Sequence, residues 1–292
     1  MKALCIAAGI VALANCSVSA ASDSGPAVAL RGRFTALSEQ LRDSPLQQGL
    51  YLESTESPRA LRGDVYAVVD YPFATVSEAF TESASWCDAL LLHLNVKYCR
   101  PEQRDAGTVL SVAIGKKTEE PLADAYRVDF AYRVTVAEPG YTEVTLEARK
   151  GPLNTENYRI SLQLISVGEQ RTFLHVGYSY DYGLAARLAM GAYLATSGSG
   201  KVGFTKVAGA NGRPPVFIGG MRGALERNTM RYYLSIDAFL GALEVTSPKR
   251  FAASSERWFA ASERYARQLH EVEHDDYITM KRSEYVRQNT LP

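Results

Sequence analysis

The sequence lacks the features that mark a membrane-embedded or nucleic-acid-binding protein. Beyond residue 20, no segment reaches the roughly 18 consecutive apolar residues that a transmembrane helix needs. Basic and acidic residues balance at 32 each, and no block of like charge stands out. Phosphate binding usually requires a basic excess, so this balance argues against nucleic acid as a partner.

Signatures of common enzymes are also missing. No Gly-x-Ser-x-Gly elbow of a hydrolase occurs. Gly198-x-Gly200-x-x-Gly203 has the spacing of a dinucleotide fingerprint, but that motif needs a strand before it and a helix after it. Here a predicted helix precedes the glycines and a loop rich in glycine and proline follows. We therefore reject the motif, and we predict no cofactor.

Histidine is scarce, with 4 residues in the chain. His270 and His274 are separated by one helical turn and flanked by carboxylates, an arrangement that could bind zinc. We prefer a solvated helix end for this pair and predict no metal site. His175 alternates onto the polar face of its predicted strand, which favours a surface role over catalysis.

Cysteine is equally scarce, also with 4 residues. Cys5 and Cys16 lie in the N-terminal segment, which leaves Cys87 and Cys99 as an even pair. Neither belongs to a Cys-x-x-Cys motif, and His93 is the only histidine between them, so a metal or redox pair is the weaker alternative. In an oxidising compartment the pair predicts a structural disulfide.

Residues 1–20 have the pattern of a secretory signal. Lys2 supplies a positive charge, an apolar run follows, and small residues precede a cleavage point after Ala20. The alternative is a lipoprotein signal with Cys16 as the lipidated residue, although Asn15 stands where that motif has a small residue. We expect an exported protein, periplasmic if the source is bacterial, rather than one anchored through Cys16.

Four segments between residues 125 and 182 alternate between apolar and polar residues with a period of two. Such alternation is typical of strands with one apolar face, and the short turns between them favour an antiparallel meander. A sheet with one apolar face needs a cover on that side. The segments run over residues 126–136, 144–148, 158–164 and 174–180.

Helical and extended patterns occupy the rest of the chain. The strongest helix covers 218–243, where Tyr232 and Ile236 belong to an apolar stripe that breaks at Thr229. Further helices are predicted at 28–41, 72–80, 86–94, 184–195 and 254–270, and further strands at 50–54, 64–71 and 109–115. The charged tail after Glu271 is predicted to be peripheral.

This order of elements resembles the helix-grip fold of the START and polyketide-cyclase superfamily, also called Bet v 1-like. The resemblance lies in the strand at 65–71 entering Pro72-Phe73-x-x-Val76, a second short helix with Trp86, the strands from 109 to 180 and the long helix. It implies an α+β protein in which a curved antiparallel sheet wraps a long C-terminal helix, with extra N- and C-terminal helices. In that fold a cavity between sheet and helix holds a lipid or another hydrophobic ligand.

The resemblance also implies a division of the chain. We expect a signal peptide (1–20), an N-terminal helical lead (21–59), a START-like domain (60–245) and a C-terminal helical extension (246–292). The segment 184–213 is an addition to the family's pattern, and it could gate the cavity.

Tyrosine is abundant, at 17 residues, and several fall on the predicted inward face. An aromatic ring with a polar tip suits an apolar cavity that orients one polar group of a ligand, although such rings also fill cores. The predicted cavity residues are Tyr126, Phe130, Tyr132, Tyr158, Leu162, Tyr178, Tyr180, Tyr232 and Ile236. For 184–195 we prefer a buried helix; the alternatives are a lid or a membrane-contacting segment, and a strand. The candidate lid residues are Leu184, Leu188 and Tyr193.

We therefore expect an exported protein that binds a hydrophobic small molecule or lipid, with peripheral membrane contact as a further option. One alternative is a cyclase-like or other enzyme of the same fold, using Asn95, Lys97 or an inward tyrosine. The other is a non-catalytic envelope interaction protein with a filled core. The sequence favours binding over catalysis and identifies no catalytic residue.

Overall fold

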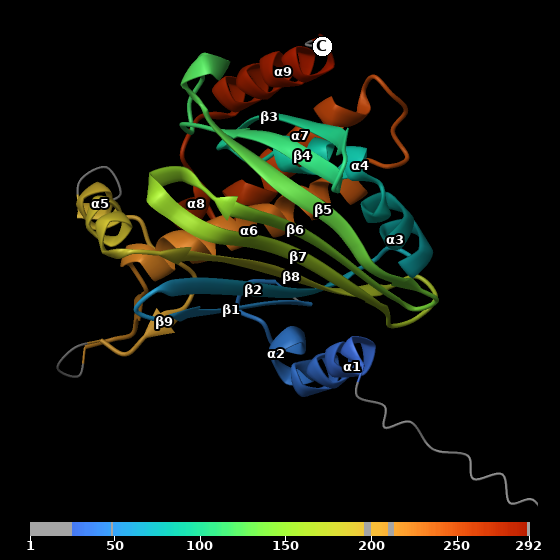
Figure 1. Ribbon diagram of the computed structural model, residues 1–292. Coiled ribbons are helices and arrows are strands. Elements are labelled where there is room, and N and C mark those ends of the chain that lie inside the picture. The colour runs from blue at the N-terminus through green and yellow to red at the C-terminus, as the bar shows by residue number, and fades with distance from the viewer. Residues whose placement is uncertain (1–24, 48, 196–199, 210–212, 291–292) are drawn as a thin grey trace, which may run out of the picture.

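The computed structural model describes residues 25–47, 49–195, 200–209 and 213–290 (Figure 1). The predicted signal peptide, with Cys16, lies outside them. One antiparallel sheet, with the strand order β1-β2-β8-β7-β6-β5-β4-β3, curves around the long helix α6 (Gly220–Leu240). This architecture confirms the predicted α+β helix-grip fold. The strands are β1 Leu50–Glu56, β2 Ala60–Val69, β3 Val96–Arg104, β4 Gly107–Ile114, β5 Tyr126–Glu138, β6 Tyr141–Lys150, β7 Thr155–Ser166 and β8 Thr172–Tyr182.

The predicted helices have counterparts, although 28–41 and 254–270 are each divided in two. The described helices besides α6 are α1 Pro26–Ala36, α2 Ser38–Arg42, α3 Phe73–Thr81, α4 Ser83–Leu91, α5 Leu184–Ala195, α7 Arg250–Glu263, α8 Ala266–Leu269 and α9 His274–Thr290. Two 3-10 turns, η1 Leu122–Asp124 and η2 Pro152–Asn154, and a small antiparallel pair of β9 Lys206–Val207 and β10 Val216–Phe217 complete the elements of the described residues.

The predicted meander is confirmed, because β5, β6, β7 and β8 pair in chain order. The earlier strands attach at its two sides: β2 pairs with β8, and β4 pairs with β5. β1 pairs with β2 and forms one edge of the sheet. The sheet therefore begins at Leu50, inside the segment predicted as a helical lead.

The inner face of the sheet is apolar, as the alternation predicts. Val128, Leu146 and Val176 are each at most 2% exposed. A β-bulge in β5 interrupts the pattern between Val134 and Val136. The inward placement of Val136 was wrong, because the extra residue after Val134 shifts the alternation and Val136 packs into the apolar cluster on the opposite face. Val134 precedes the bulge and pairs with the inner-face residue Val144, but its own side chain is 38% exposed.

That opposite face carries a second, smaller core under α1 and α2 (Figure 1). The sheet is thus covered on part of both faces, which the strict alternation of the meander did not predict. The members of this cluster are Leu30, Leu37, Leu41, Tyr66, Tyr141, Ile165 and Phe173.

His175 belongs to this outer face but not to the surface. It is 6% exposed, so the predicted surface role is wrong. Its Nε2 lies 2.7 Å from Asp64 Oδ1, and its Nδ1 lies 2.8 Å from Gln163 Oε1. The imidazole also stacks on Tyr66, with ring centroids 4.5 Å apart. These contacts tie β2, β7 and β8 together and account for the burial of a histidine here.

Helix α6 is enclosed on nearly all sides rather than along one apolar stripe. Glu226, Arg227 and Arg231 are each at most 4% exposed, although they lie off the predicted stripe. The break of that stripe at Thr229 is where α6 crosses β2. A Cβ atom at Gly63 would lie 2.3 Å from Thr229 Oγ1, so the absence of a side chain at Gly63 allows α6 to pack closely against β2.

The tail after Glu271 is part of the core, so its predicted peripheral position is wrong. Helix α9 buries Tyr277 completely and contacts α7 and β3. It also contributes a buried ionic group, in which Lys97 Nζ lies 3.0 Å from Glu284 Oε1 and Lys281 Nζ lies 2.7 Å from Glu284 Oε2. The charged composition that indicated a solvated tail includes these paired residues.

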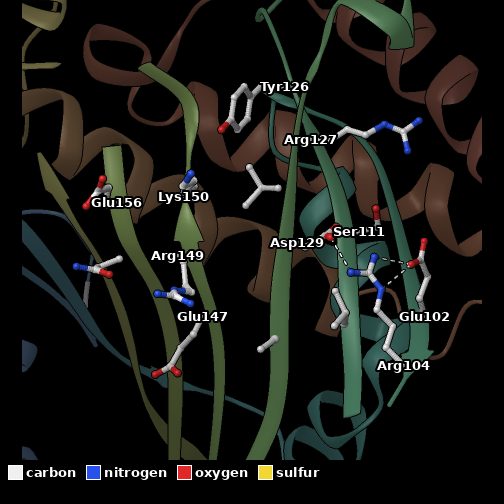
Figure 2. Close-up of a pocket in the computed structure, with 14 residues that line it drawn as sticks. Glu102, Arg104, Ser111, Tyr126, Arg127, Asp129, Glu147, Arg149, Lys150 and Glu156 are labelled. Carbon is white, nitrogen blue, oxygen red and sulfur yellow. Dashed lines mark hydrogen bonds and ion pairs between the residues drawn. The ribbon is translucent and has the colours of Figure 1, made fainter. Parts of the chain in front are cut away.

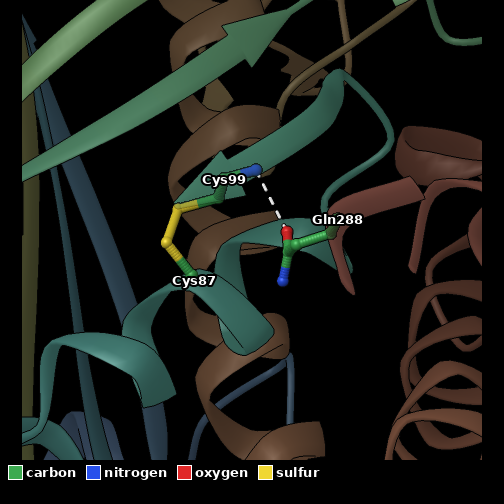
Figure 3. The surroundings of a disulfide bond; sticks show 3 residues. All are labelled: Cys87, Cys99 and Gln288. Carbon is green, nitrogen blue, oxygen red and sulfur yellow. Dashed lines mark hydrogen bonds between the residues drawn. A yellow bond between two sulfur atoms is a disulfide. The ribbon is translucent and has the colours of Figure 1, made fainter. Parts of the chain in front are cut away.

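The predicted disulfide is confirmed: Cys87 of α4 and Cys99 of β3 are bonded (Figure 3). The backbone N–H of Cys99 donates a hydrogen bond to Gln288 Oε1 of α9 at 3.0 Å. The bond therefore holds α4 against the edge strand on which the C-terminal helix docks.

We predict that replacing both cysteines with serine lowers the free energy of unfolding by about 3 kcal/mol, because a short covalent loop is lost from the unfolded chain. Urea denaturation of the oxidised protein and of the Cys87→Ser/Cys99→Ser variant measures the difference. Reduction of the native protein by dithiothreitol should reproduce it. An unchanged denaturation midpoint would show that the disulfide adds no stability.

We predict a larger loss from Glu284→Gln, about 3–5 kcal/mol, because both buried ammonium groups lose their shared carboxylate. Glu256→Gln is the matched control, since its side chain is 55% exposed and its partner His274 is 47% exposed. Equal losses in the two variants, measured by urea denaturation at neutral pH, would contradict this account.

Two lysines make stability depend on pH: the buried Lys281, which pairs with Glu284, and the partly buried Lys117, which pairs with Glu271. Burial lowers the pKa of Lys281 from 10.5 to about 8, and burial lowers the pKa of Lys117 to about 8 as well. Between about pH 8 and 10 the unfolded lysines keep protons that the folded ones release, so the free energy of unfolding rises with pH. Lys281→Met should reduce this slope in urea denaturation, and an unaltered slope would exclude Lys281 as its source.

Candidate functional site

Most predicted cavity residues lie between the sheet and α6, where they pack against one another. Phe130, Leu162 and Ile236 are each at most 2% exposed. Four tyrosines form a continuous aromatic cluster, extended by His93, whose ring lies 4.8 Å from that of Tyr232. Its centroid distances are 5.1 Å for Tyr158 and Tyr180, 5.0 Å for Tyr178 and Tyr232, and 5.6 Å for Tyr178 and Tyr180.

These rings are suited to packing rather than to proton transfer. Burial raises the pKa of Tyr178 well above its ordinary value and raises that of Tyr232 in the same direction. The Tyr132 hydroxyl donates to the Thr81 carbonyl oxygen at 2.6 Å, and burial raises its pKa to about 12. The contacts agree with rings that fill the core, and a role in ligand binding stays a prediction.

Tyr126 is the exception, because its side chain is 44% exposed. It stands where the sheet splits. β5 pairs with β4 from Tyr126 onward but with β6 only from Ala131, opposite Glu147. The two strands diverge beyond that pair, and Figure 2 shows Tyr126 and Lys150 facing each other across the opening. The pocket over this split has a volume of about 1140 Å³.

The split is lined by charged side chains of both signs. Arg104 forms ion pairs with Glu102 at 2.6 Å and with Asp129 at 2.7 Å (Figure 2). In the described part of the chain, no carboxylate lies within 4.0 Å of Arg127 or Arg149. An open, charged hollow of this kind does not resemble the enclosed, mostly apolar site that a hydrophobic ligand requires.

A second pocket, of about 550 Å³, opens beside the edge strand β1. Four aromatic rings from separate parts of the chain line it. Tyr51 comes from β1, Phe204 from the segment before β9, Phe217 from β10 and Tyr265 from the residue before α8. Arg222, in the first turn of α6, closes one side. The pocket therefore lies where the edge of the sheet meets the start of the long helix.

Glu226 forms the support of this pocket. Its carboxylate accepts hydrogen bonds from Phe204 N at 2.6 Å, Thr205 N at 2.9 Å and Thr205 Oγ1 at 2.7 Å. The Ser54 hydroxyl of β1 also donates to it. A fully buried carboxylate on α6 thus fastens the hairpin segment on one side and the edge strand on the other.

Gly203 has a packing role in this arrangement, which accounts for one glycine of the rejected fingerprint. A Cβ atom there would lie 2.5 Å from Glu226 Oε2 and 2.9 Å from the Cα atom of Gly223. Only glycine allows this approach of the segment to α6. Gly198 of the same motif lies outside the described residues.

The pocket has more basic than acidic side chains available. Lys206, Arg222 and Arg264 line it, and Arg222 Nε donates to Ser54 Oγ at 2.7 Å. Its lining carboxylate, Glu53, is paired with Arg33 at 2.5 Å. Aromatic walls with a few cations suit an apolar molecule that carries an acidic group. No local sequence pattern joins these residues, so sequence reasoning missed the pocket.

The candidate enzyme residues are occupied by structural contacts. The Asn95 side-chain amide donates to the Gly115 carbonyl oxygen at 2.6 Å, and Lys97 is bound to Glu284. His270 lies 3.0 Å from Glu263, whereas His274 lies 2.8 Å from Glu256, a different carboxylate. Across the residues that the structure describes, no group of three His, Cys, Asp or Glu could hold a metal.

Helix α5 forms as predicted, and among its described side chains one set is covered and another is exposed. Ala186 is 1% exposed, and Met190 packs against the core. The predicted lid residues Leu184 and Leu188 are 75% and 67% exposed, so the helix is not a buried one. The side chain of Tyr193 lies outside what the structure describes. No helix in the described ranges has the length and apolar character to cross a membrane.

No protein-family model matches the chain, and no curated protein matches it. Among solved structures, a START superfamily protein from Mycobacterium smegmatis has 12% identity and a TM-score of 0.32, covering 43% of this chain and 79% of that chain. Human StAR-related lipid transfer protein 5 has 12% identity and a TM-score of 0.30, covering 54% and 83%. Norcoclaurine synthase from Thalictrum flavum, in complex with dopamine and hydroxybenzaldehyde, has 13% identity and a TM-score of 0.33, covering 51% and 80%. Similarity at this level concerns general architecture and carries nothing about ligands.

We predict that Glu226→Gln releases the hairpin segment, because an amide cannot accept as many hydrogen bonds and presents N–H groups to backbone N–H donors. Hydrogen exchange at the amides of Phe204 and Thr205 should accelerate at least about tenfold, and the free energy of unfolding should fall by about 2–4 kcal/mol. Unchanged protection of these two amides would show that Glu226 does not hold the segment.

Proposed function

We propose that the protein is an exported binding protein for a hydrophobic small molecule or lipid that carries an acidic group. The observation that carries the proposal is the pocket of about 550 Å³ beside β1, with its aromatic walls and surplus of basic side chains. Its volume falls within the range of about 300–1,000 Å³ that is usual for small-molecule sites.

The apolar part of the ligand would contact the rings of Tyr51, Phe204 and Tyr265. Arg264 is the cation most available to an acidic group, because no described carboxylate lies within ion-pair distance of it. Lys206 is already engaged with the ring of Phe217, with its Nζ 5.4 Å from the centroid. A charge-assisted hydrogen bond from Arg264 would orient the ligand with its acidic end towards α7 and α8.

Export to the periplasm is part of this proposal. It is supported by the signal-like residues 1–20, with cleavage after Ala20, and by the bonded pair Cys87 and Cys99. Disulfides persist in oxidising compartments and are rare in the cytosol. Lipidation at Cys16 is the alternative mode of export.

The packed interior favours a second candidate, a non-catalytic interaction protein with a filled core. The stacked rings of Tyr158 and Tyr180 and of Tyr178 and Tyr232 are the observation behind it. This candidate predicts that purified protein carries no small molecule in either pocket. A cyclase-like enzyme is less well supported, because Asn95 and Lys97 serve structural contacts.

The proposal predicts that protein expressed with its signal sequence co-purifies with an acidic lipid or apolar acid. Native mass spectrometry followed by solvent extraction identifies the bound species. Delipidated protein should bind 8-anilinonaphthalene-1-sulfonate, an apolar dye with a sulfonate group, more tightly than the uncharged dye Nile red. Arg264→Gln should weaken binding of the anionic dye about tenfold, the loss expected for one charge-assisted hydrogen bond.

Arg282→Gln is the matched control, because Arg282 is an exposed arginine on α9, outside the pocket lining. It should bind both dyes as the native protein does. A protein that is empty after gentle purification and binds neither dye would exclude the proposed function. Equal weakening by both arginine substitutions would mean that the dye binds elsewhere.

A further inference from the structure

Exposed apolar side chains gather at one end of the sheet. Tyr126 is 44% exposed, Leu153 60%, Leu184 75% and Leu188 67%. These residues lie at the start of β5, in η2 between β6 and β7, and in α5 directly after β8. Antiparallel pairing brings the ends of β6, β7 and β8 together, and α5 contacts η2. Tyr126 faces this end from across the split between β5 and β6 (Figure 2). We call this surface the α5 end of the molecule.

Helix α5 itself has apolar residues on two faces. Ala186, Met190 and Leu194 follow each other at intervals of four and pack towards the core. Leu184 and Leu188 are also separated by one turn, and they point away from it. A soluble helix normally turns polar residues to this side, so the outward leucines are unpartnered in the described structure.

The segment that carries α5 has a charge of one sign. Residues 182–225 contain no Asp or Glu, whereas they contain the basic residues Arg187, Lys201, Lys206, Arg213 and Arg222. Arg149 and Lys150, at the end of β6, add two more basic side chains next to η2. Two of these basic residues are already paired, Lys201 with Glu271 at 3.3 Å and Arg222 with Glu226 at 3.9 Å. Acidic residues near the strand ends include Glu56, Asp124, Glu156 and Asp181. In the described part of the segment, Arg187, Lys206 and Arg213 have no carboxylate within 4.0 Å, so the segment carries basic charge although the whole chain is neutral.

We propose that the α5 end docks on the surface of an anionic lipid bilayer. Leu153, Leu184 and Leu188 would enter the boundary between headgroups and acyl chains, and Arg187 and Lys150 would contact the phosphates. Exposed leucines surrounded by basic residues match such a surface, because both the apolar and the charged components of the partner are then satisfied. An acidic surface without apolar groups would satisfy the charges but would leave the leucines without apolar contacts.

This inference deepens the proposed function, since a bilayer would be the source or destination of a bound lipid. The hairpin that lines the pocket, with Thr205, Lys206 and Phe217, belongs to the same basic segment. Docking would bring the pocket mouth near the headgroups. The docking surface nevertheless depends on residues other than those that line the pocket, so the two can be tested separately.

The test uses the mature chain, residues 21–292, which has neither signal peptide nor lipid anchor. Flotation is measured with vesicles of equal parts phosphatidylglycerol and phosphatidylethanolamine and with vesicles of phosphatidylcholine. We expect binding to the anionic vesicles that weakens as salt is added, and little binding to phosphatidylcholine. Leu184→Ser/Leu188→Ser should lower the partition to anionic vesicles at least about tenfold.

Val286→Ser is the matched control, because Val286 is an exposed apolar residue, at 54%, on the distant helix α9. It should float as the native protein does. Leu188→Trp supplies a second readout, since its fluorescence should shift to shorter wavelength with anionic vesicles. Thermal melting verifies that the variants are folded.

Binding that survives Leu184→Ser/Leu188→Ser, or that is equal for both kinds of vesicle, overturns the proposal. An unshifted Leu188→Trp spectrum does the same. Dye binding tests the proposed function separately, because the Leu184→Ser/Leu188→Ser variant should still bind 8-anilinonaphthalene-1-sulfonate. If this variant loses flotation but keeps dye binding, docking does not depend on the pocket. If the native protein does not bind the dye, the proposed function fails, but the flotation result still tests docking.

Discussion

The enclosure of α6 is the constraint on which the rest of the structure depends. This helix carries Glu226 and Arg231 into the interior, and buried charges are tolerated only when partners neutralise them. Glu226 accepts hydrogen bonds from the backbone N–H groups of Phe204 and Thr205, and Arg231 lies 3.0 Å from Glu271. The chain before α6 and the chain after α7 therefore complete the core, because they supply groups that the sheet alone does not offer.

The pocket beside β1 follows from the same constraint. Glu226 draws the hairpin segment towards α6 and holds Ser54 of the edge strand from the other side. Glu226 therefore holds β1 and the hairpin segment next to α6, and the pocket lies between them with aromatic side chains from both. The edge strand β1 contributes Tyr51, Leu52, Glu53 and Ser54 to one wall of this pocket.

The sequence predicted the fold better than the site. Alternation placed Ile160, Leu162 and Val176 on the inner face, because period-two patterns report which side of a strand is buried. The alternation wrongly predicted that His175 is exposed, because it does not reveal that Asp64 and Gln163 on the neighbouring strands form hydrogen bonds with its ring. It also predicted cavity tyrosines without being able to tell whether their rings enclose space or fill it. The pocket was missed altogether because its walls come from segments more than two hundred residues apart in the chain.

By itself, then, the sequence determined the meander, the long helix and the pairing of Cys87 with Cys99. The meander and the long helix depend on local periodicity, and the disulfide depends on there being only two cysteines beyond the N-terminal segment. These predictions need no knowledge of distant contacts. Only the tertiary structure decided which buried carboxylate meets which cation, how the tail after Glu271 becomes core, and where a pocket opens. Those outcomes depend on contacts between side chains that are far apart in the sequence, and such contacts produce no periodic pattern along the chain.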